Sequence, residues 1–577
     1  MKHWRTAAHA VSVAIAVVSP TALVATAGHA VAGAVYYVAP NGSDSAAGTQ
    51  AAPFASIARA QAAAQPGDTV YLRGGTYAYT RANSTCSSQT ARVDAITLNK
   101  SGSPGNLIRY WAYPGEKPVF DFSRMTDNCR IKGFSVTGSY IHLKGLEARG
   151  VPQNNDLNAE SWGIWVSGSN NTFEMINTHH HMGTGLFISG GGGNLVLNSD
   201  SHDNYDLNSS DGPGENADGF GSHYTPAGRP ANVFRGCRAW WNADDGYDLI
   251  STYSPVTIEN SWSWRNGYQP GTTTPSGNGV GFKVGGFGGE YDAGAVKHTV
   301  RFSVAFLNKA AGFYSNHHPV ANDYFDNTSY GNHPDFNMLG IDSSGAAVGR
   351  GTLRNNIAYT GTLTSNMTGT SSAHNSWDLG VTLSDSQFQS VSTSGWDAPR
   401  RTDGGLPTLP HLRLAADSAL IDKGINVGLP YTGQAPDLGA FERPGDTPPA
   451  GQRYEAESAP AVCQGTIDAN WAGFSGAGFC NGDNAVGAYA QFTVNAPPGG
   501  TAALGIRFAN GAGGARAANL VVNGSTVATV SFESTGAWST WATRTVNVPL
   551  NAGGNTIRLD PTTTAGLPNL DYLDANA

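Results

Sequence analysis

A glycine followed mostly by apolar or aromatic residues recurs six times through the middle of the chain. The six glycines are Gly163, Gly185, Gly219, Gly246, Gly281 and Gly312. Successive glycines are 22, 34, 27, 35 and 31 residues apart. A base period near 22 residues with insertions is what a parallel β-helix requires, because each coil takes one repeat and the insertions become loops. The repeat therefore predicts a right-handed parallel β-helix, called the solenoid below.

A column of asparagines supports the same register. Asn204, Asn242, Asn266, Asn308 and Asn332 each close a short run such as AWWN or SWRN. Asn-Gly turns explain single instances but not the shared spacing. Side-chain amides stacked at an inner turn can hydrogen-bond to one another and to the backbone. We therefore expect an asparagine ladder inside the solenoid.

The chain divides into four segments. Residues 1–34 have the basic start, apolar run and small-residue cleavage site of an export signal. Residues 443–452 are rich in Pro and Gly without periodicity, which predicts a linker between the solenoid, residues 35–442, and residues 453–577. The last segment alternates short strands with Gly and Asn turns, which is typical of a β-sandwich. The fold class predicted is therefore all-β, apart from a short helix at 56–64 with Ser56 as its N-cap.

The cysteines fit an exported protein, because disulfides form in oxidising compartments. Proximity in the sequence pairs Cys86 with Cys129 and Cys463 with Cys480, and it leaves Cys237 as a buried free thiol. After the export signal, no run is long and apolar enough to span a membrane. We expect a secreted, monomeric protein that is not bound to a membrane.

The net charge argues against nucleic acid as a partner. The formal charge is −9, and it becomes −11 when Lys2 and Arg5 are removed with the export signal. Nucleic-acid binding depends on neutralising phosphates, which an acidic protein does poorly. A polyanion could be bound only through local cations or a bound metal.

Carboxylates gather around one of the repeat glycines. Asp244, Asp245 and Asp248 lie in NADDGYDL, and Asp218 lies in the related phrase NADGF. Carboxylates this close repel one another unless a cation neutralises them. Oxygen ligands suit Ca²⁺, which takes six to eight of them, better than zinc. A solvated turn explains an isolated Asp-Asp-Gly, but the repeat favours a calcium site.

The same columns bring in a lysine. Two residues after the repeat glycine come Asp248 and Lys283 in successive coils, which lie about 4.8 Å apart. One residue before the glycine come Asp218 and Asp245. These two columns would face opposite sides of a straight strand, so their convergence needs a bend near Gly246. With that bend, the carboxylates and the lysine share one patch of the outer surface.

The phrases from NADGF through NADDGYDL to GFKV resemble polysaccharide lyase family 9, the calcium-dependent pectate lyases. The resemblance runs through most of residues 35–442. It implies a right-handed parallel β-helix that cleaves polygalacturonate by β-elimination, with endo- and exo-acting members that the motif does not separate. The calcium ligands and the catalytic base implied by the resemblance are Asp218, Asp244, Asp245, Asp248 and Lys283.

Elimination at a uronate needs both a cation beside the substrate carboxylate and a base. Removing the proton from C5 of a uronate is difficult because the adjacent carboxylate resists further negative charge. A Ca²⁺ ion that bridges protein and substrate carboxylates offsets that charge and makes C5–H more acidic. A free lysine with a pKa near 10.4 is only ~1% deprotonated at pH 8.5, so Lys283 needs a lowered pKa or alkaline conditions. The alternative role for Lys283 is an ion pair with Asp248.

Four aspartates with one calcium ion leave a negative charge that repels pectate, so further calcium or nearby cations must help. The candidates for substrate binding, each of which is otherwise a solvated coil charge, are Arg229, Arg235, Arg265, Lys297 and Arg301. The tract at 179–181, three histidines, is predicted to be a turn and not a metal site, because strand alternation splits its side chains. Trp240, Trp241, Trp262 and Trp264 are expected to fill coil interiors and cover strands.

The C-terminal segment carries a second resemblance. YEAESA at its start and NLDYLD at its end resemble carbohydrate-binding modules of families 6 and 35, which are β-sandwiches of the jelly-roll type. The resemblance implies a structural calcium held by Glu455, Glu457 and Asp571. It places Trp538 and Asn569 near a sugar site, whereas packing inside the sandwich is the alternative for Trp538.

Two other functions remain open. A β-helical glycoside hydrolase, such as a polygalacturonase, would use Asp244 and Asp245 as acid and base at a set separation and would need no lysine. A non-catalytic polysaccharide-binding solenoid would leave Lys283 without a role. The function that the sequence favours is a secreted calcium-dependent pectate lyase with a carbohydrate-binding module.

Overall fold

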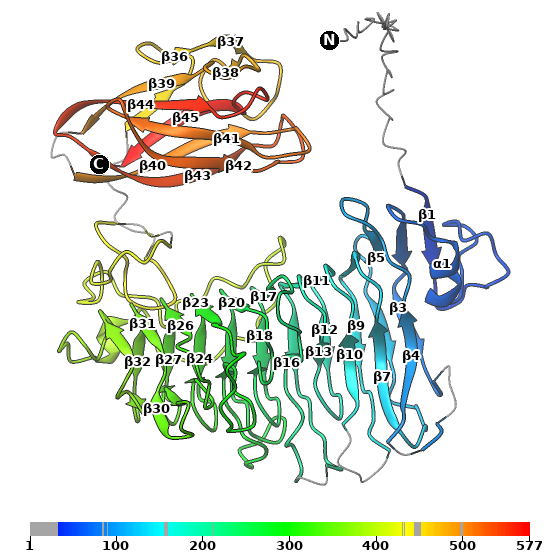
Figure 1. Ribbon diagram of the computed structural model, residues 1–577. Helices are drawn as coiled ribbons and strands as arrows, with labels where there is room; N and C mark the ends of the chain where they lie inside the picture. Colours follow the sequence, from blue (N-terminus) through cyan, green and yellow to red (C-terminus); the bar gives the residue numbers. More distant parts are fainter. Residues whose placement is uncertain are drawn as a thin grey trace, which may run out of the picture.

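The structure is a computed structural model in which a long stack of β-coils is followed by a β-sandwich (Figure 1). It describes residues 33–82, 86–88, 90–154, 160–209, 212–429, 431, 433–443, 452–496 and 500–576. Nearly all of the predicted export signal and of the predicted linker lies outside these ranges. Within the described ranges, no helix is long and apolar enough to cross a membrane.

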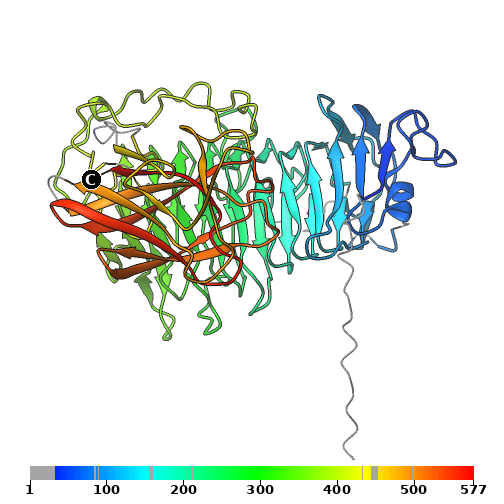
Figure 2. The same cartoon turned by 90° about the horizontal axis from the view of Figure 1, so that it is seen from above.

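Three parallel sheets run side by side along the stack, and each successive coil adds one strand to each sheet (Figures 1 and 2). Sheet A consists of β1 (Val35–Val38), β2 (Thr69–Leu72), β5 (Ile108–Ala112), β8 (Ile141–Lys144), β11 (Thr172–Glu174), β14 (Leu195–Leu197), β17 (Asn232–Arg235), β20 (Val256–Glu259), β23 (Thr299–Arg301), β26 (Asp323–Phe325), β31 (Thr352–Arg354) and β34 (Ser371–Ala373). Sheet B consists of β3 (Gly75–Ala78), β6 (Pro118–Asp121), β9 (Glu147–Arg149), β12 (Asn177–His179), β15 (Asp200–His202), β18 (Arg238–Trp240), β21 (Trp262–Trp264), β24 (Val304–Phe306), β27 (Thr328–Tyr330) and β32 (Ile357–Tyr359).

Sheet C is the third side of the coil and carries the residues around the repeat glycines. It consists of β4 (Arg92–Leu98), β7 (Arg130–Val136), β10 (Trp162–Val166), β13 (Leu186–Ser189), β16 (Phe220–His223), β19 (Tyr247–Asp248), β22 (Phe282–Lys283), β25 (Phe313–Tyr314), β28 (Phe336–Asn337) and β33 (Thr364–Ser365). A hairpin of β29 (Leu339–Ile341) and β30 (Ala347–Gly349) and a short 3₁₀ helix, η1 (Asp385–Gln387), complete this part of the chain. The predicted parallel β-helix is confirmed.

The helix α1 (Ile57–Ala63) lies beside β1 at the N-terminal end of the stack (Figure 1). Its N-cap is Ser56, whose Oγ accepts a hydrogen bond of 3.1 Å from the backbone N–H of Arg59. Ile57 and Ala60 are buried against the solenoid core, so the helix covers apolar residues that would otherwise face water. The helix predicted from the sequence is therefore present.

The strand register matches the predicted columns. Along sheet C, Phe187 pairs with Gly221, Gly221 with Asp248, Asp248 with Lys283, and Lys283 with Tyr314. Residues far apart in the sequence therefore become neighbours in adjacent coils.

The reason for the repeat glycines differs from the one expected. Gly246 does not adopt a positive φ angle, so conformational freedom is not what the position requires. A Cβ atom there would lie 2.1 Å from the Ser263 Oγ and 2.7 Å from the Gly281 carbonyl oxygen. A Cβ atom at Gly219 would likewise lie 2.7 Å from the Gly246 carbonyl oxygen. Glycine is needed because successive coils approach this closely.

The asparagine ladder is present and buried. The side-chain amide nitrogen of each member donates to the side-chain oxygen of the next, at 2.8 Å from Asn204 to Asn242, 3.0 Å to Asn266, 2.9 Å to Asn308 and 3.0 Å to Asn332. Backbone N–H groups also donate to these oxygens, as Asn242 does to Asn266 at 3.1 Å. The ladder satisfies buried polar groups at a turn where no sheet can do so.

Stacked aromatic rings fill the interior of the solenoid behind sheet C. Phe220, Tyr247, Phe282, Phe313 and Phe336 follow one another with ring centroids 4.8–5.2 Å apart. All five are fully buried. This interior column fixes which face of each strand points outward, and so it holds Asp248 and Lys283 on the outer side of the same strands.

The segment after β34 runs back along the stack and covers the outer face of sheet B (Figure 2). Trp262 and Trp264 are buried beneath it, and Trp396 from this segment lies with its ring centroid 4.4 Å from that of Trp262. These two tryptophans lie outside the coil and not in its interior, which corrects part of the expectation from the sequence. The expectation that they cover strands is correct.

The C-terminal module has two antiparallel sheets packed on a shared apolar core. One sheet consists of β37 (Gly465–Asp468), β38 (Phe479–Gly482), β45 (Asn569–Asn576), β40 (Gly500–Ala509), β43 (Ala542–Leu550) and, paired with β45, β35 (Gln452–Glu455). The other consists of β36 (Val462–Cys463), β39 (Ala490–Ala496), β44 (Gly553–Pro561), β41 (Arg516–Val522) and β42 (Ser525–Phe532). The predicted β-sandwich is confirmed.

The cysteines pair as expected. Cys86 is bonded to Cys129 in the solenoid, and Cys463 is bonded to Cys480 in the module. Cys237 is a buried free thiol whose Sγ lies 3.3 Å from the carbonyl oxygen of Val196.

Replacing Asn266 by Ala should lower the free energy of unfolding by about 1–3 kcal/mol. The backbone N–H and a side-chain N–H of Asn242 lose their buried acceptor, and Asn308 Oδ1 loses one of its two donors. Denaturant unfolding followed by tryptophan fluorescence measures the change. Asn99→Ala at an exposed position is the matched control and should change stability little. Equal stability of the two variants would show that the ladder contributes nothing to the fold.

Candidate functional site

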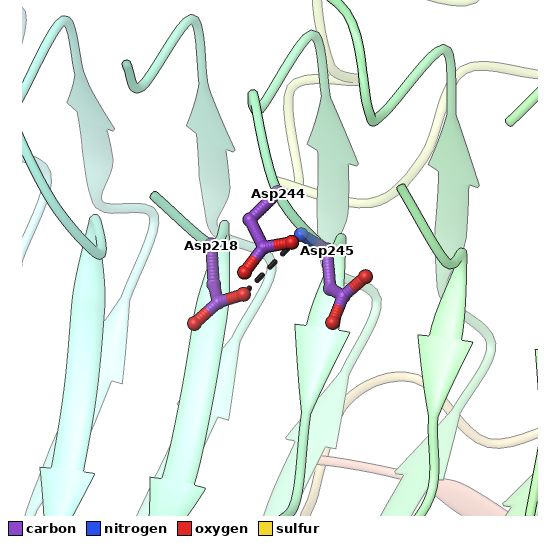
Figure 3. A group of neighbouring side chains, drawn as sticks. All are labelled: Asp218, Asp244 and Asp245. Carbon is purple, nitrogen blue, oxygen red and sulfur yellow. Dashed lines mark hydrogen bonds between the residues drawn. The ribbon is translucent and has the colours of Figure 1, made fainter. Parts of the chain in front are cut away.

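Three carboxylates meet just before β16 and β19 on sheet C. Asp218 precedes β16, and Asp244 and Asp245 precede β19 (Figure 3). One oxygen from each of the three lies within 4.8 Å of the oxygens from the other two. All three residues are buried. We call these residues the carboxylate group.

The lengths of the connections from sheet B to sheet C explain why this group is buried. The coil that carries Asp244 and Asp245 crosses in 6 residues, 241–246, whereas the coils on either side use 17 residues each, 203–219 and 265–281. The two long loops meet over the short connection, where Ser276 Oγ donates to the Pro213 carbonyl oxygen at 2.6 Å. The carboxylate group therefore lies at the bottom of a notch between two loops.

Backbone N–H groups hold each carboxylate in place. Asn278 N–H donates to Asp244 Oδ1 at 2.6 Å, and Val280 N–H donates to Asp245 Oδ1 at 2.7 Å. Asp218 Oδ1 accepts from the N–H of Asp245 at 3.2 Å. These donors come from adjacent coils, so the register of the stack sets the geometry of the group.

Lys283 joins this group to Asp248. The Lys283 Nζ lies 3.0 Å from Asp245 Oδ2 and 3.0 Å from Asp248 Oδ2. Only the contact with Asp248 has hydrogen-bond geometry, so the contact with Asp245 is ionic. The Asp248 Oδ1 accepts from Ile250 N–H at 2.8 Å and lies 3.5 Å from His223 Nε2. Asp248 is therefore paired with Lys283, lies beside His223, and is not one of the three carboxylates that converge.

The electrostatics of the site depend on burial and on the crowding of charge. Burial, and then the neighbouring carboxylates, raise the pKa of Asp218 and of Asp244 well above the usual range. For Asp248, burial alone would raise the pKa, but Lys283 and His223 lower it below its usual value. Burial lowers and the aspartates raise the pKa of Lys283, and the aspartates prevail. The site is short of positive charge, which is what a bound cation would supply.

Asp218, Asp244, Asp248 and Lys283 line a groove of about 430 Å³ on the outer face of sheet C. The groove extends along the stack to Arg92, Arg130, Trp162 and Trp165 on β4, β7 and β10. The repeat pattern in the sequence does not predict these four as site residues. Trp165 lies two residues after a repeat glycine, in the same column as Asp248 and Lys283, and that position could have identified it. The two arginines precede the first repeat glycine, so no column includes them.

The five cations predicted to bind substrate lie elsewhere. Arg235 and Arg301 both pair with Glu259 on sheet A, and Lys297 pairs with Asp323 at 3.0 Å. These contacts are on a different side of the coil from the groove. The structure therefore does not bring them to Lys283.

Arg229 and Arg265 are also outside the described lining of the groove. The backbone N–H of Arg229 donates to Ser254 Oγ, and the guanidinium of Arg265 lies 5.3 Å from the ring centroid of Trp241. The histidine tract has its side chains divided, since the ring of His179 stacks on that of His202 whereas His181 is fully buried.

The three acidic residues predicted to bind calcium in the module lie around Ser475. Its N–H donates to both carboxylate oxygens of Asp571, at 2.9 and 3.1 Å, and its Oγ donates to Glu455 Oε1 at 2.7 Å. Glu457 Oε1 accepts from the N–H of Ala477 at 2.8 Å. The Oε2 atoms of both glutamates are buried without a hydrogen-bond partner. Burial raises the pKa of Asp571 to about 6, against the opposing effects of the Ser475 N–H and Arg507, and the two glutamates add a smaller increase.

The two residues predicted near a sugar site differ in exposure. Trp538 is half-buried, with the guanidinium of Arg516 at 5.0 Å from its ring centroid. Asn569 is buried in β45. Arg516 is held by Asn484 Oδ1 at 3.0 Å and by the carbonyl oxygen of Leu567 at 2.7 Å.

Comparison with known proteins identifies the family of the solenoid. Residues 36–356 match the family described as Pel9A-like, right handed beta helix region. The chain belongs to this family. Residues 462–576 match the family described as carbohydrate binding module (family 6), which accounts for the C-terminal module.

Relatives of this Pel9A-like protein include pectate lyase L of Dickeya chrysanthemi, which is 39% identical over 396 residues, 67% of this chain and 85% of that protein. A solved structure described as pectate lyase Pel9A is 38% identical, with a TM-score of 0.60 over 71% of this chain and 96% of the other. A solved rhamnogalacturonan lyase is 35% identical, with a TM-score of 0.62 over 67% of this chain and 97% of the other.

Replacing Asp218 by Asn should stabilise the metal-free protein at neutral pH. Because the pKa of Asp218 is raised on folding, the unfolded chain releases this proton first, so stability falls as pH rises above the unfolded pKa near 4. The advantage of the variant should therefore shrink as pH falls toward 4. Thermal melting in a chelating buffer measures it, with the exposed Asp417→Asn as control.

The same substitution should weaken binding of a divalent cation roughly tenfold or more, since one ligand oxygen loses its charge. Added calcium should then raise the melting temperature less for Asp218→Asn than for the wild-type protein. Two outcomes would contradict Asp218 as a calcium ligand with a raised pKa. One is a variant that is less stable than the wild type without metal, and the other is a variant whose melting temperature rises with calcium as much as that of the wild type.

Proposed function

We propose that this protein is a secreted calcium-dependent pectate lyase that cleaves α-1,4-galacturonan by β-elimination. The observation that carries the proposal is the position of Lys283, with its Nζ 3.0 Å from Asp245 Oδ2 and from Asp248 Oδ2, beside three converging carboxylates. Membership of the Pel9A-like family supports it, because relatives across much of the solenoid are pectate lyases.

Calcium fits the carboxylate group. The donors are buried oxygens, with no nitrogen or sulfur ligand in the described group, and this set suits a hard cation. Asp218, Asp244 and Asp245 would hold the ion, and Asp248 remains the predicted fourth ligand although its Oδ2 contacts Lys283. Bound calcium would contact the substrate carboxylate, offset its charge and make the C5–H bond more acidic.

Lys283 is the proposed base. Its Nζ would take the proton from C5 while the electrons of that C–H bond form the C4–C5 double bond and the C4–O4 bond breaks. The departing oxygen would take a proton from water. Asp245 and Asp248 hold the Nζ in place and stabilise the ammonium that forms, which is why both contacts matter after proton transfer.

Other functions make different products. A glycoside hydrolase would use Asp244 and Asp245 as its acid and base, but oxygens of these residues lie within 4.8 Å, closer than the roughly 6.5–9.5 Å that an inverting hydrolase leaves for water. A purely binding solenoid would make no product. Rhamnogalacturonan is a second candidate substrate, since a solved rhamnogalacturonan lyase has a TM-score of 0.62 with this chain.

One experiment separates these functions. The ultraviolet absorbance of the unsaturated sugar is followed on polygalacturonate and on rhamnogalacturonan, each with and without a chelator. A calcium-dependent pectate lyase gives the signal on polygalacturonate and loses it with the chelator. Reducing sugar without absorbance indicates a hydrolase, and no change on either substrate indicates a binding protein.

The rest of the chain fits this role. The two disulfides support the proposed secretion, and the family 6 module supports binding to cell-wall polysaccharide. Glu455, Glu457 and Asp571 are proposed to hold a structural calcium, and Trp538 and Asn569 to border its sugar site. We propose that the protein acts as a monomer, with residues 35–442 as the catalytic domain, 443–452 as linker and 453–577 as the module.

Replacing Lys283 by Ala should lower the rate of elimination by about 10²–10⁴-fold, the usual contribution of a general base. Calcium should still raise the melting temperature, because the carboxylate group remains. Initial rates of absorbance increase measure the loss. Lys144→Ala, a lysine on sheet A that pairs with Glu174, is the control and should keep normal activity. Activity of Lys283→Ala within threefold of the wild type would remove Lys283 from the mechanism.

The rate should rise from neutral to alkaline pH as Lys283 loses its proton. Since uncompensated aspartates raise the pKa of Lys283, calcium at those aspartates should lower it. The rising limb of kcat/KM against pH should therefore move to lower pH as calcium increases. Profiles at two calcium concentrations test this. A maximum of kcat/KM at acidic pH would favour the hydrolase. A rising limb at the same pH at both calcium concentrations would show that calcium does not affect the pKa of Lys283.

A further inference from the structure

Basic and aromatic residues gather at the N-terminal end of the groove, away from Lys283. We call Arg92, Arg130, Lys132, Trp162 and Trp165 the basic cluster. The guanidinium of Arg92 lies 5.5 Å from the ring centroid of Trp162 and 5.1 Å from that of Trp165. Arg130 lies 4.4 Å from the ring centroid of Trp162, and the Lys132 Nζ lies 4.6 Å from that of Trp165. The two buried tryptophans therefore make cation–π contacts with all three cations.

The positive charge of the basic cluster is only partly balanced. Arg130 pairs with Glu160 at 2.5 Å, and the Lys132 Nζ lies 3.6 Å from Asp94. The exposed Arg92 has no carboxylate within ion-pair distance among the residues that the structure describes. Arg92 also stands directly opposite Arg130 in the register, and like charges in such pairs are destabilising. An anion bound at Arg92 would relieve this repulsion.

Aromatic rings connect the basic cluster to the carboxylate site. The ring centroid of Trp165 lies 5.2 Å from that of Phe187, which lies 4.7 Å from that of His223. The His223 Nε2 lies 3.5 Å from Asp248 Oδ1. A Cβ atom at Gly221 would lie 2.5 Å from the Phe187 ring. Because Gly221 has no side chain, the Phe187 ring can lie on the floor of the groove. The groove is continuous from Arg92 to Lys283.

The two ends of the groove are too far apart for one sugar. Trp165 and Lys283 stand in the same column, separated by four register steps through Phe187, Gly221 and Asp248. At about 4.8 Å a step, the separation is about 19 Å. A sugar at Lys283 cannot reach Arg92, so a ligand that contacts both must be a chain with several sugars.

We propose that the basic cluster is a second carboxylate-binding subsite, in which Arg92 binds a uronate several sugars away from the one at Lys283. This inference rests on the proposed function, since it assumes a polyuronate in the groove. A guanidinium binds a carboxylate through two parallel hydrogen bonds, and the tryptophans hold the plane of Arg92 in place. The subsite also counters the repulsion between an acidic site and an acidic polymer. A methyl-esterified sugar has no charge for Arg92 to bind.

Binding by an inactive protein tests the subsite without catalysis. In the Lys283→Ala background with calcium present, Arg92→Gln should weaken binding of a long oligogalacturonate about three- to tenfold by calorimetry. It should not change binding of a galacturonate dimer, which cannot span the groove, or of a fully methyl-esterified polymer. In the active enzyme, Arg92→Gln should raise KM by a similar factor and leave kcat within twofold.

The matched control is Arg109→Gln. Arg109 also lies beside a tryptophan, 5.7 Å from the ring centroid of Trp111, but on sheet A and outside the groove. Equal affinity of the Arg92 and Arg109 variants for the long oligomer would overturn the subsite, as would an equal loss on the esterified polymer. If the wild type binds long oligomers but makes no unsaturated product, the lyase proposal fails while the comparison of variants still decides the subsite.

Discussion

The hydrogen-bond register between successive coils decides which side chains of this molecule can meet. Asp248 and Lys283 are 35 residues apart in the chain, yet they are directly paired because β19 and β22 are neighbours. The same register brings the backbone donors of Asn278 and Val280 to Asp244 and Asp245. The ladder of buried asparagines and the column of stacked rings keep the coils from slipping, and a slip of one residue would turn every outer side chain inward.

The sequence predicts whatever follows the repeat, and this includes the pairing of Asp248 with Lys283. It predicts less where the period is lost. Arg92 and Arg130 precede the first repeat glycine, so no column placed them beside the site. The segment that covers Trp262 and Trp264 has no period of its own, and its contacts depend on folding back over sheet B. The sequence predicts that position 246 needs glycine for a bend in the strand. The actual reason is the close approach of the neighbouring coil, which only the three-dimensional structure shows.

The site combines a fold that is stable with a charge arrangement that is not. Asp218, Asp244 and Asp245 are buried within 4.8 Å of one another, and Lys283 compensates only part of their charge. Such a group persists because the surrounding coils fix it through backbone donors and interior packing. The deficit of positive charge favours a divalent cation, and it also means that an acidic polymer, the proposed substrate, would approach a surface that repels it. In the proposed function, basic residues further along the groove, above all Arg92, would offset that repulsion at a distance from Lys283, the proposed base.

The unequal loops around the site have an evolutionary consequence. Connections 203–219 and 265–281 are almost three times as long as the connection 241–246 between them, and yet the strands that flank all three stay in register. Insertions or deletions in the outer loops can therefore reshape the walls of the groove without displacing Asp248 or Lys283. A lineage built on this coil can therefore vary the walls of its groove as long as Asp218, Asn278 and Val280, which lie at the ends of the same loops, keep their places.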